Sequence, residues 1–431
     1  MTKYETALEL LKKASLQGSR LGLERVTELV SLLGDPQNSY KIIHVAGTNG
    51  KGSFSAMLSS VLSAQGYKVG TFSSPYMLTY NDCVRINGMI LSEETFGDAV
   101  IRAAEVSEQM TELPTEFELL TGAVFMLLKE QGCEYAVIEC GMGGDGDSTN
   151  VINEPLLSVI TNVELDHQAF LGNTHAEIAS HKAGIIKQGR PVFFGGDNAE
   201  ALDVIKGRAE CNGSKLYRLD PSKIRFIDTD KILSKGITFN YGSTEVSVPL
   251  RGSYQFKNII NVISCIDILR ELSVKITDLS VCVGLASVSW EGRFELLSAD
   301  PTVIFDGAHN PDGMRSLCDS IKLCFPNTRP VILTGVLADK DYKLYSDMLY
   351  PLIDSAFTIT PDNPRALGAD KLAECFNENG IKAKAFTSIK DGLNAAYEYC
   401  KQKDLPLLII GSLYLYKDIR PLIPKRLIPA E

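Results

Sequence analysis

The sequence predicts an α/β protein of two domains, each built on a doubly wound, mainly parallel sheet. The chain has 431 residues, which is too long for one ordinary domain and fits two or three, of which we expect two. Short continuous apolar runs of strand length alternate with stretches of helical periodicity along most of that length. Strands that are apolar throughout are buried on both faces, as in a parallel sheet covered by helices on both sides.

The elements of the first domain follow from these patterns in order. Helical periodicity predicts helices over residues 4–13, 24–33, 51–65, 116–132 and 176–186. Apolar runs predict strands over residues 41–46, 67–72, 135–140 and 156–161. Residues 214–250 contain short alternating segments with turn residues, which predicts a small antiparallel patch before a helix that starts near Gln255.

A second series of apolar runs predicts a Rossmann-like α/β domain. Its strands are expected over residues 302–307, 330–336, 355–360 and 405–411. The boundary is placed near Phe294–Pro301, so the predicted domains are residues 1–295 and 296–431.

Composition and charge exclude several classes of protein. The 43 Lys and Arg residues against 53 Asp and Glu give a net charge of −10, which argues against a long basic track for nucleic acid. No apolar run is long enough to span a bilayer or to act as a secretion signal. The ten cysteines are scattered without a C-x-x-C pair, which indicates reduced thiols. We expect a cytoplasmic monomer with neither nucleic-acid nor membrane partners.

The stretch "HVAGTNGKGSFSAML" (44–58) predicts a phosphate-binding loop, or P-loop, between a strand and a helix. It departs from the common G-x-x-x-x-G-K-[ST] spacing, because Val45 stands at the first glycine position. Lys51 is expected to reach the β- and γ-phosphates of a nucleoside triphosphate, and the Ser53 or Thr48 hydroxyl to assist the metal or the phosphates. A tightly packed turn without a ligand is the alternative. The predicted cradle consists of Gly47, Thr48, Asn49, Gly50, Lys51, Gly52 and Ser53.

Eight segments along nearly the whole chain share their order with one enzyme family. They read "HVAGTNGKGS", "VIECGMGGDGDSTNV", "ELDHQAFLG", "EIASHKAGIIK", "WEGRFELL", "FDGAHNPDG", "GVLADKDY" and "DNPR". In these motifs the chain resembles folylpolyglutamate synthase and dihydrofolate synthase, which belong to the ATP-dependent Mur ligase superfamily. The resemblance implies that ATP phosphorylates a carboxylate and that an amine attacks the acyl phosphate.

The resemblance also implies a magnesium site and a modified lysine. Glu139 ends a predicted strand, where α/β sheets gather their ligands, and with Ser74 and His167 it is expected to hold two Mg2+ ions. Because Mg2+ prefers oxygen ligands, a structural role for His167 remains the alternative. Lys182 is expected to carry a CO2-derived carbamate that binds metal, whereas its pattern alone also fits a solvated lysine on an amphipathic helix.

Five further residues are implied in nucleotide or intermediate binding. Gln255 and Asn258 resemble the family's nucleotide-contacting amides, although such a pair also fits an ordinary surface. Arg293 is expected to reach the ATP phosphates, with a linker salt bridge as the alternative. Asp306 and His309 follow a predicted strand and are expected to contact ATP or the intermediate. Lys51, Lys182 and His309 are the predicted catalytic residues.

Two positions depart from the family pattern. Many relatives carry a positively charged residue near Asp145, which weakens any prediction of a cation in that loop. Asp82-Cys83 stands where bifunctional relatives usually carry Glu-Arg, in a loop thought to hold the pteridine. This substitution leaves the use of dihydropteroate open.

The sequence therefore predicts a ligase that adds L-glutamate to a reduced folate, with ATP and Mg2+, and leaves open whether it also joins glutamate to dihydropteroate. A cell-wall Mur ligase is the first alternative, but those enzymes carry a sugar-nucleotide domain ahead of the loop, and only about forty residues precede Gly47. A non-enzymatic ATP-gated switch is the second, and glutamate would not change its ATPase rate.

Overall fold

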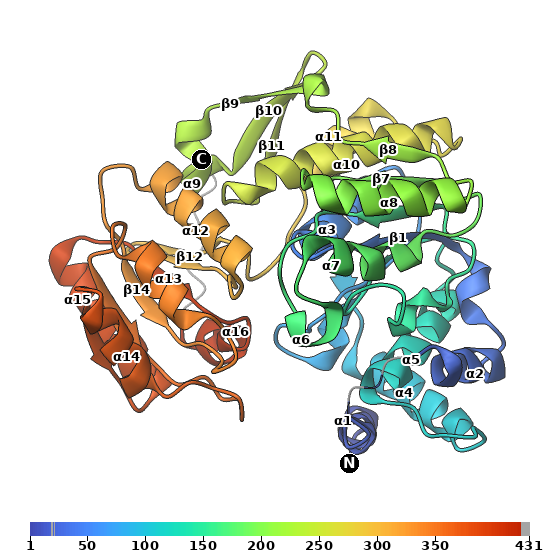
Figure 1. Ribbon diagram of the computed structural model, residues 1–431, viewed down its shortest axis with the longest axis horizontal. Helices are drawn as coiled ribbons and strands as arrows, with labels where there is room; N and C mark the ends of the chain where they lie inside the picture. Colours follow the sequence, from blue (N-terminus) through green and yellow to red (C-terminus); the bar gives the residue numbers. More distant parts are fainter. Residues whose placement is uncertain (19, 21, 424–431) are drawn as a thin grey trace. The chain divides into compact units, whose positions relative to one another are not determined.

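The computed structural model describes every residue of the chain except 19, 21 and 424–431 (Figure 1). The chain divides into two compact units. The N-terminal unit comprises Met1–Ile224, Tyr241–Val246 and Lys257–Val288, and the C-terminal unit comprises Arg225–Asn240, Ser247–Phe256 and the residues from Ser289 onward. Among the helices of the described residues, none combines the length and apolar character that crossing a membrane requires.

An eight-stranded sheet forms the centre of the N-terminal unit, in the order β4-β3-β2-β5-β1-β6-β7-β8. The strands β2, β5, β1, β6, β7 and β8 are parallel, and β3 and β4 are antiparallel additions at one edge. The strands are β1 (Lys41–Ala46), β2 (Val69–Phe72), β3 (Val84–Ile86), β4 (Met89–Ile90), β5 (Tyr135–Glu139), β6 (Leu157–Ile160), β7 (Val192–Phe194) and β8 (Leu216–Arg218).

The four strands predicted for this domain are confirmed as β1, β2, β5 and β6, all fully buried except at Lys41. The prediction for residues 214–250 is wrong at its start, because β8 pairs in parallel with β7 instead of joining an antiparallel patch. β8 is a three-residue edge strand with only partly buried side chains, so its sequence lacks the apolar run of an inner strand.

Several helices of this unit begin at a capping side chain. Thr115 and Thr174 each form a capping box with a glutamate three residues later, which places the starts of α5 and α7. The prediction of one helix over 176–186 is corrected, because α7 ends at Lys182 and a 3-10 turn follows. The helices are α1 (Lys3–Ser15), α2 (Glu24–Leu32), α3 (Lys51–Ala64), α4 (Glu93–Ser107), α5 (Glu116–Glu130), α6 (Gln168–Leu171), α7 (His175–Lys182), α8 (Ala199–Cys211), α10 (Tyr254–Glu271) and α11 (Asp278–Ala286); α10 begins in the C-terminal unit.

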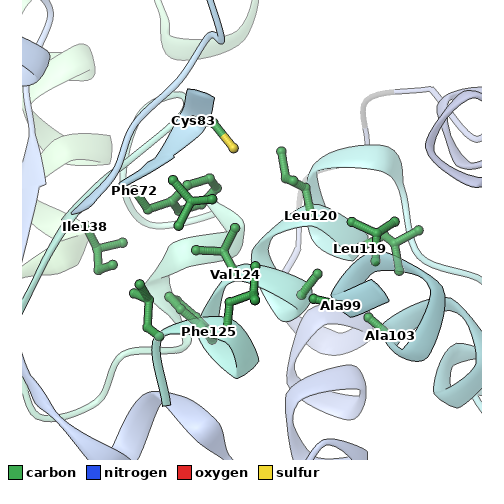
Figure 2. Packing of buried hydrophobic residues seen from close by; sticks show 14 of the residues in the cluster. Phe72, Cys83, Ala99, Ala103, Leu119, Leu120, Val124, Phe125 and Ile138 are labelled. Atoms are coloured by element: carbon green, nitrogen blue, oxygen red, sulfur yellow. The ribbon is translucent and has the colours of Figure 1, made fainter. Parts of the chain in front are cut away.

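A buried apolar cluster joins helices α4 and α5 to strands β2 and β5. Figure 2 shows Phe72 and Ile138 of the sheet beside Val124 and Phe125 of α5. Each of these side chains is fully buried, and burying one contributes about 1.5–3 kcal/mol. The cluster thereby holds the carboxyl end of β5, where Glu139 lies.

A separate three-stranded antiparallel sheet, in the order β11-β10-β9, confirms the rest of the predicted patch. The two-residue turn Gly242-Ser243 joins β10 to β11, and Gly242 has a φ of 58°, which suits a tight hairpin turn. The elements are β9 (Ile224–Ile227), α9 (Ile232–Lys235), β10 (Ile237–Tyr241) and β11 (Thr244–Val248).

The C-terminal unit contains the second α/β sheet that the sequence predicts, in the order β12-β13-β17-β14-β15-β16. All its pairs are parallel except that of β12 with β13. The strands are β12 (Glu295–Ala299), β13 (Thr302–Phe305), β14 (Val331–Thr334), β15 (Ser355–Thr358), β16 (Lys382–Ala385) and β17 (Leu407–Ile410). The helices are α12 (Pro311–Cys324), α13 (Tyr342–Leu349), α14 (Ala369–Glu378), α15 (Ile389–Lys403) and α16 (Leu415–Ile419).

Candidate active site

The glycine loop connects β1 to α3 and has the conformation that its glycines allow. Gly50 is left-handed, with a φ of 83°, and directly precedes α3. A Cβ atom on Gly47 would lie 1.9 Å from the Thr161 hydroxyl, and one on Gly50 would lie 2.5 Å from Asn258 Oδ1. Both positions therefore require glycine. The first backbone N–H groups of α3 have no partner within the helix, which makes this end of the helix suited to an anion.

The loop is held from the side by the segment that follows β6. The backbone N–H groups of Thr48 and Asn49 donate to Asn162 Oδ1, at 3.1 and 2.8 Å. The Thr48 hydroxyl donates to the Glu164 carbonyl and accepts from the Glu164 N–H, at 3.1 and 3.0 Å. The protein itself thus uses the Thr48 hydroxyl both as donor and as acceptor, and the Ser53 hydroxyl at the start of α3 is buried.

The side chains of Lys51 and Glu139 lie close together beside the glycine loop. The Lys51 ammonium donates to the Gly47 carbonyl at 3.0 Å and to the Thr48 carbonyl at 3.3 Å. Its Nζ atom is 3.8 Å from Oε1 of Glu139, whose side chain is buried at the end of β5. A cation and a carboxylate are thus held in one place, where a phosphate and a metal ion need opposite charges.

Lys182 is buried, so it is not a solvated lysine on an amphipathic face. It is the last residue of α7, and only 3% of its surface is exposed. Burial, and after it the charge of Lys51, lowers the pKa of its amine to about 7, while Cys140, Asp166 and Asp147 act in the opposite direction. At neutral pH a large share of this amine is therefore uncharged.

Ser74 and His167 lie on loops beyond the carboxyl ends of β2 and β6. The His167 side chain is exposed and its backbone is left-handed, with a φ of 50°, so it is not a buried structural histidine. The backbone N–H of His167 donates to the Asp166 carboxylate at 2.8 Å. Ser74 is partly buried.

A buried hydrogen-bond network that starts at His44 of β1 was not predicted from the sequence. His44 of β1 is fully buried, and its Nε2 atom lies 2.8 Å from the Thr149 hydroxyl and 3.2 Å from the Cys140 sulfur. The Thr149 hydroxyl and N–H both donate to Asp147 Oδ1, at 2.5 and 3.0 Å, and the Met142 N–H donates to Asp147 Oδ2 at 2.8 Å. The signal that could have revealed it was a histidine inside the otherwise apolar run "KIIHVA".

This hydrogen-bond network also determines which ring nitrogen of His44 carries the proton. Because the Thr149 hydroxyl gives its proton to Asp147, it accepts from His44, which places the imidazole proton on Nε2. Burial lowers the pKa of His44 to about 3, and the charge of Lys187 adds to this effect, so the ring is neutral.

The loop with the unusual Asp82-Cys83 pair is ordered by the aspartate. Its carboxylate accepts from the backbone N–H groups of Met77, Leu78 and Thr79, at 2.7 to 3.2 Å. Cys83 is 2% exposed and belongs to the apolar cluster of Figure 2. The cysteine therefore packs in the core and has no polar role in this loop.

In the C-terminal unit, Asp306 organises the turn that carries Arg293. Its Oδ2 atom accepts from the Tyr254 hydroxyl at 2.7 Å and from the Phe294 N–H at 2.9 Å, and Oδ1 accepts from the Ala308 N–H at 2.8 Å. Asp306 is 3% exposed, and burial raises the pKa of its carboxyl group. Phe294 has a φ of 46°, a strained conformation for a bulky residue that these bonds hold in place.

The side chains of Arg293 and His309 both lie close to Gly307. A Cβ atom on Gly307 would lie 3.1 Å from Nη1 of Arg293, and the guanidinium donates to the Gly292 carbonyl, also at 3.1 Å. His309 Nδ1 donates to the Gly307 carbonyl at 2.7 Å, so Nε2 is the basic nitrogen of the neutral ring. Gln255 is fully buried near the start of α10, so it is not an ordinary surface residue.

The structure thus assembles two groups of predicted residues, one in each unit. The N-terminal unit holds the glycine loop, Lys51, Glu139, Lys182 and Asn258, and the charge of Lys51 is felt at the Lys182 amine. The C-terminal unit holds Gln255, Arg293, Asp306 and His309. Ser74 follows β2 and His167 lies beyond β6, so both lie past the carboxyl ends of parallel strands of the sheet that carries Glu139.

Comparison with known proteins identifies both halves of the chain. Residues 45–266 match the Mur ligase middle domain, and residues 292–413 match the Mur ligase glutamate ligase domain. The dihydrofolate synthase/folylpolyglutamate synthase of Bacillus subtilis is 34% identical over 97% of this chain and 99% of its own length. A folylpolyglutamate synthase of Mycobacterium tuberculosis complexed with ADP and AMPPCP has a TM-score of 0.88 and 27% identity, over 98% of this chain and 99% of that chain. The Escherichia coli FolC in complex with DHPP and ADP has a TM-score of 0.83 and 28% identity, over 97% of both chains.

Proposed function

The chain belongs to the folylpolyglutamate synthase and dihydrofolate synthase family of Mur ligases, and we propose that it is an ATP-dependent ligase that adds L-glutamate to folates. A carboxylate and an amine do not join spontaneously in water, so the carboxylate must first be activated. Transfer of the γ-phosphate of ATP gives an acyl phosphate, and the glutamate amine then displaces inorganic phosphate. The observation that carries the proposal is the glycine loop with Lys51 and Glu139 at its base.

The loop fits the phosphates of ATP. Gly47 and Gly50 leave no room for a Cβ atom beside Thr161 and Asn258, and the turn that they form leads into the N-terminus of α3, where backbone N–H groups suit a phosphate. We propose that Lys51 exchanges its carbonyl contacts for the β- and γ-phosphates and stabilises negative charge during transfer. Asn258, which packs against Gly50, is proposed as a nucleotide contact, together with the buried Gln255.

The N-terminal unit also offers ligands for Mg2+. The buried Glu139 carboxylate fits a hard cation, and we propose Ser74, His167 and a carbamylated Lys182 as the other ligands. When bound, Mg2+ neutralises the charge of the transferring phosphate. Glu139 ends β5, and Ser74 and His167 follow β2 and β6, so these three lie at or beyond the carboxyl ends of strands, where ligands of α/β sheets gather.

We propose that Lys182 carries a carbamate. An uncharged amine attacks CO2 to give the carbamate and releases one proton to solvent. A buried ammonium beside Lys51 would place two positive charges where a metal ion must bind, whereas the carbamate supplies an anionic oxygen. Burial, which favours the neutral amine, supports this step.

In the C-terminal unit, we propose that Arg293, Asp306 and His309 contact ATP or the acyl phosphate. Asp306 holds the turn that presents Arg293, and the Gly307 carbonyl orients the His309 ring. A positive guanidinium stabilises the negative charge that develops on a transferring phosphoryl group.

The function is tested by the substrates that ADP release requires. Purified protein with ATP, Mg2+ and glutamate is offered tetrahydrofolate or dihydropteroate in separate reactions, and the products are separated by chromatography. ADP release should depend jointly on a pterin acceptor and glutamate, because hydrolysis without an acceptor wastes the acyl phosphate. Steady ADP release that folate and glutamate leave unchanged would support an ATP-gated switch instead.

Carbamylation is tested by replacing Lys182. The Lys182→Ala enzyme should be folded and nearly inactive, and acetate should restore part of the rate by supplying an oxygen ligand. Lys182→Arg keeps a positive charge but cannot carry a carbamate, so it should be equally poor. Near-normal turnover of Lys182→Arg would contradict the proposal.

A further inference from the structure

The glycine-rich loop after β5 lies directly on the end of α7 that carries Lys182. The Asp145 N–H donates to the His181 carbonyl at 2.8 Å. A Cβ atom on Gly144 would lie 2.6 Å from the His181 carbonyl oxygen and 3.0 Å from Lys182 Cα. A Cβ atom on Gly184 would lie 2.5 Å from Asp145 Cα. Backbone therefore touches backbone on both sides of the lysine, at two glycines that allow the approach.

One side-chain pair spans this contact. His181 Nδ1 lies 2.9 and 3.0 Å from the two carboxylate oxygens of Asp145. The Asn150 amide donates to the carbonyls of Asp145 and Gly184, at 3.0 and 3.3 Å, and so ties the same two segments together. We call the Asp145–His181 pair the loop clamp.

The clamp is too exposed to contribute much to the stability of the whole unit. The His181 and Asp145 side chains are 32% and 52% exposed, and pairs of this kind are weak. Their effect must therefore be local, on whether the loop stays closed on the turn after α7. Lys182 directly precedes that turn and is buried, with 3% of its surface exposed.

We propose that Asp145 and His181 are positioning residues, which hold the loop 141–147 closed on α7 and thereby keep the Lys182 amine in the buried place where it is carbamylated. This inference rests on the proposed carbamylation of Lys182. When the loop opens, water reaches the lysine, and the carbamate takes up one proton and loses CO2 to leave the free amine. The clamp shifts this balance toward the carbamate without touching ATP or folate.

The inference predicts a specific kinetic change. In His181→Ala and Asp145→Ala, the bicarbonate concentration that gives half-maximal turnover should rise about fivefold, the upper effect expected of a partly exposed pair. Saturating bicarbonate should restore kcat, and KM for ATP should stay as in the wild type. A merely structural role would lower kcat at every bicarbonate concentration.

The experiment has a matched control on the same helix. His175 of α7 has its Nε2 atom 3.5 Å from Oε2 of Glu164, and both side chains are 27% exposed. His175→Ala therefore removes a similar pair that does not involve the loop 141–147. It should leave the bicarbonate dependence unchanged. The double variant Asp145→Arg with His181→Glu exchanges the charges of the clamp, and should recover most of the wild-type dependence.

A second readout separates this inference from the proposed function. The carbamate carbon is observed by 13C NMR after addition of labelled bicarbonate to the enzyme without substrates. A wild-type signal that weakens in the two single variants and returns in the double variant supports the clamp. An equal signal and equal half-saturation in all variants overturn the clamp but keep the carbamate, whereas no wild-type signal with a bicarbonate-independent rate overturns both.

Discussion

Replacing His44 by glutamine should change how the stability of the N-terminal unit depends on pH. The imidazole is fully buried, with its pKa lowered from 6.5 to about 3 by burial and by the charge of Lys187. In the unfolded chain the same ring takes up a proton near its ordinary pKa. The unfolded state therefore binds more protons than the folded state between about pH 6.5 and pH 3, and wild-type stability falls as the pH falls through this window.

The size of the effect follows from the difference in pKa. Each pH unit well inside the window removes about 1.4 kcal/mol, so lowering the pH from about 7.5 to about 5 removes about 2 kcal/mol through His44 alone. Glutamine does not titrate but loses part of the hydrogen bonding to Thr149, which costs about 1 kcal/mol at every pH. The variant should thus be less stable than the wild type at pH 7.5 and at least as stable at pH 5.

The assay is urea unfolding from pH 5 to pH 8, followed by hydrogen-exchange mass spectrometry of peptides that cover β1. This readout reports on the N-terminal unit even when the two units unfold separately. Asp147, whose pKa burial raises, titrates in both proteins, so its contribution cancels in the difference. Parallel stability curves for the two proteins would refute the assignment of a neutral, buried His44.

The remaining predictions concern the phosphate loop and the metal ligand. Lys51→Ala should lower turnover by about 10²–10³ with an unchanged melting temperature, measured as ADP release, and a near-normal rate would remove Lys51 from the site. Glu139→Gln should raise the Mg2+ concentration for half-maximal activity by about tenfold or more, measured by Mg2+ titration; an unchanged requirement would argue against Glu139 as a ligand. Gly47→Ala should abolish binding of a fluorescent ATP analogue, because its Cβ would lie 1.9 Å from the Thr161 hydroxyl. Gly66→Ala, also at positive φ but with open space around it, should still bind, and equal binding by both variants would contradict the crowding argument.

Much of the fold was predictable from local patterns. The inner strands β1, β5 and β6 are continuous apolar runs, because a parallel sheet covered on both faces leaves no place for a polar side chain. The edge strands β4 and β8 were missed for the converse reason, since the two residues of β4 are exposed and those of β8 are only partly buried, and neither strand is long enough to form such a run. The glycine loop was predictable because its backbone conformation restricts which residues can stand there.

The burial of single polar residues was decided by the tertiary structure. Lys182 and a solvated helix lysine look alike in sequence, and only the packing of α7 under the loop 141–147 makes this amine buried. Asp306 is likewise buried against a residue distant in the chain, Tyr254, and Gln255 is buried as well.

The sequence by itself determined the order of the elements, the phosphate loop and the chemistry that its motifs resemble. These properties depend on neighbouring residues, through backbone conformation and the periodicity of apolar side chains. The tertiary structure alone decided which distant groups meet, such as His44 with Thr149 and Asp145 with His181. Such pairs join residues that are 105 and 36 positions apart, and no local preference of the chain reports a contact across that separation.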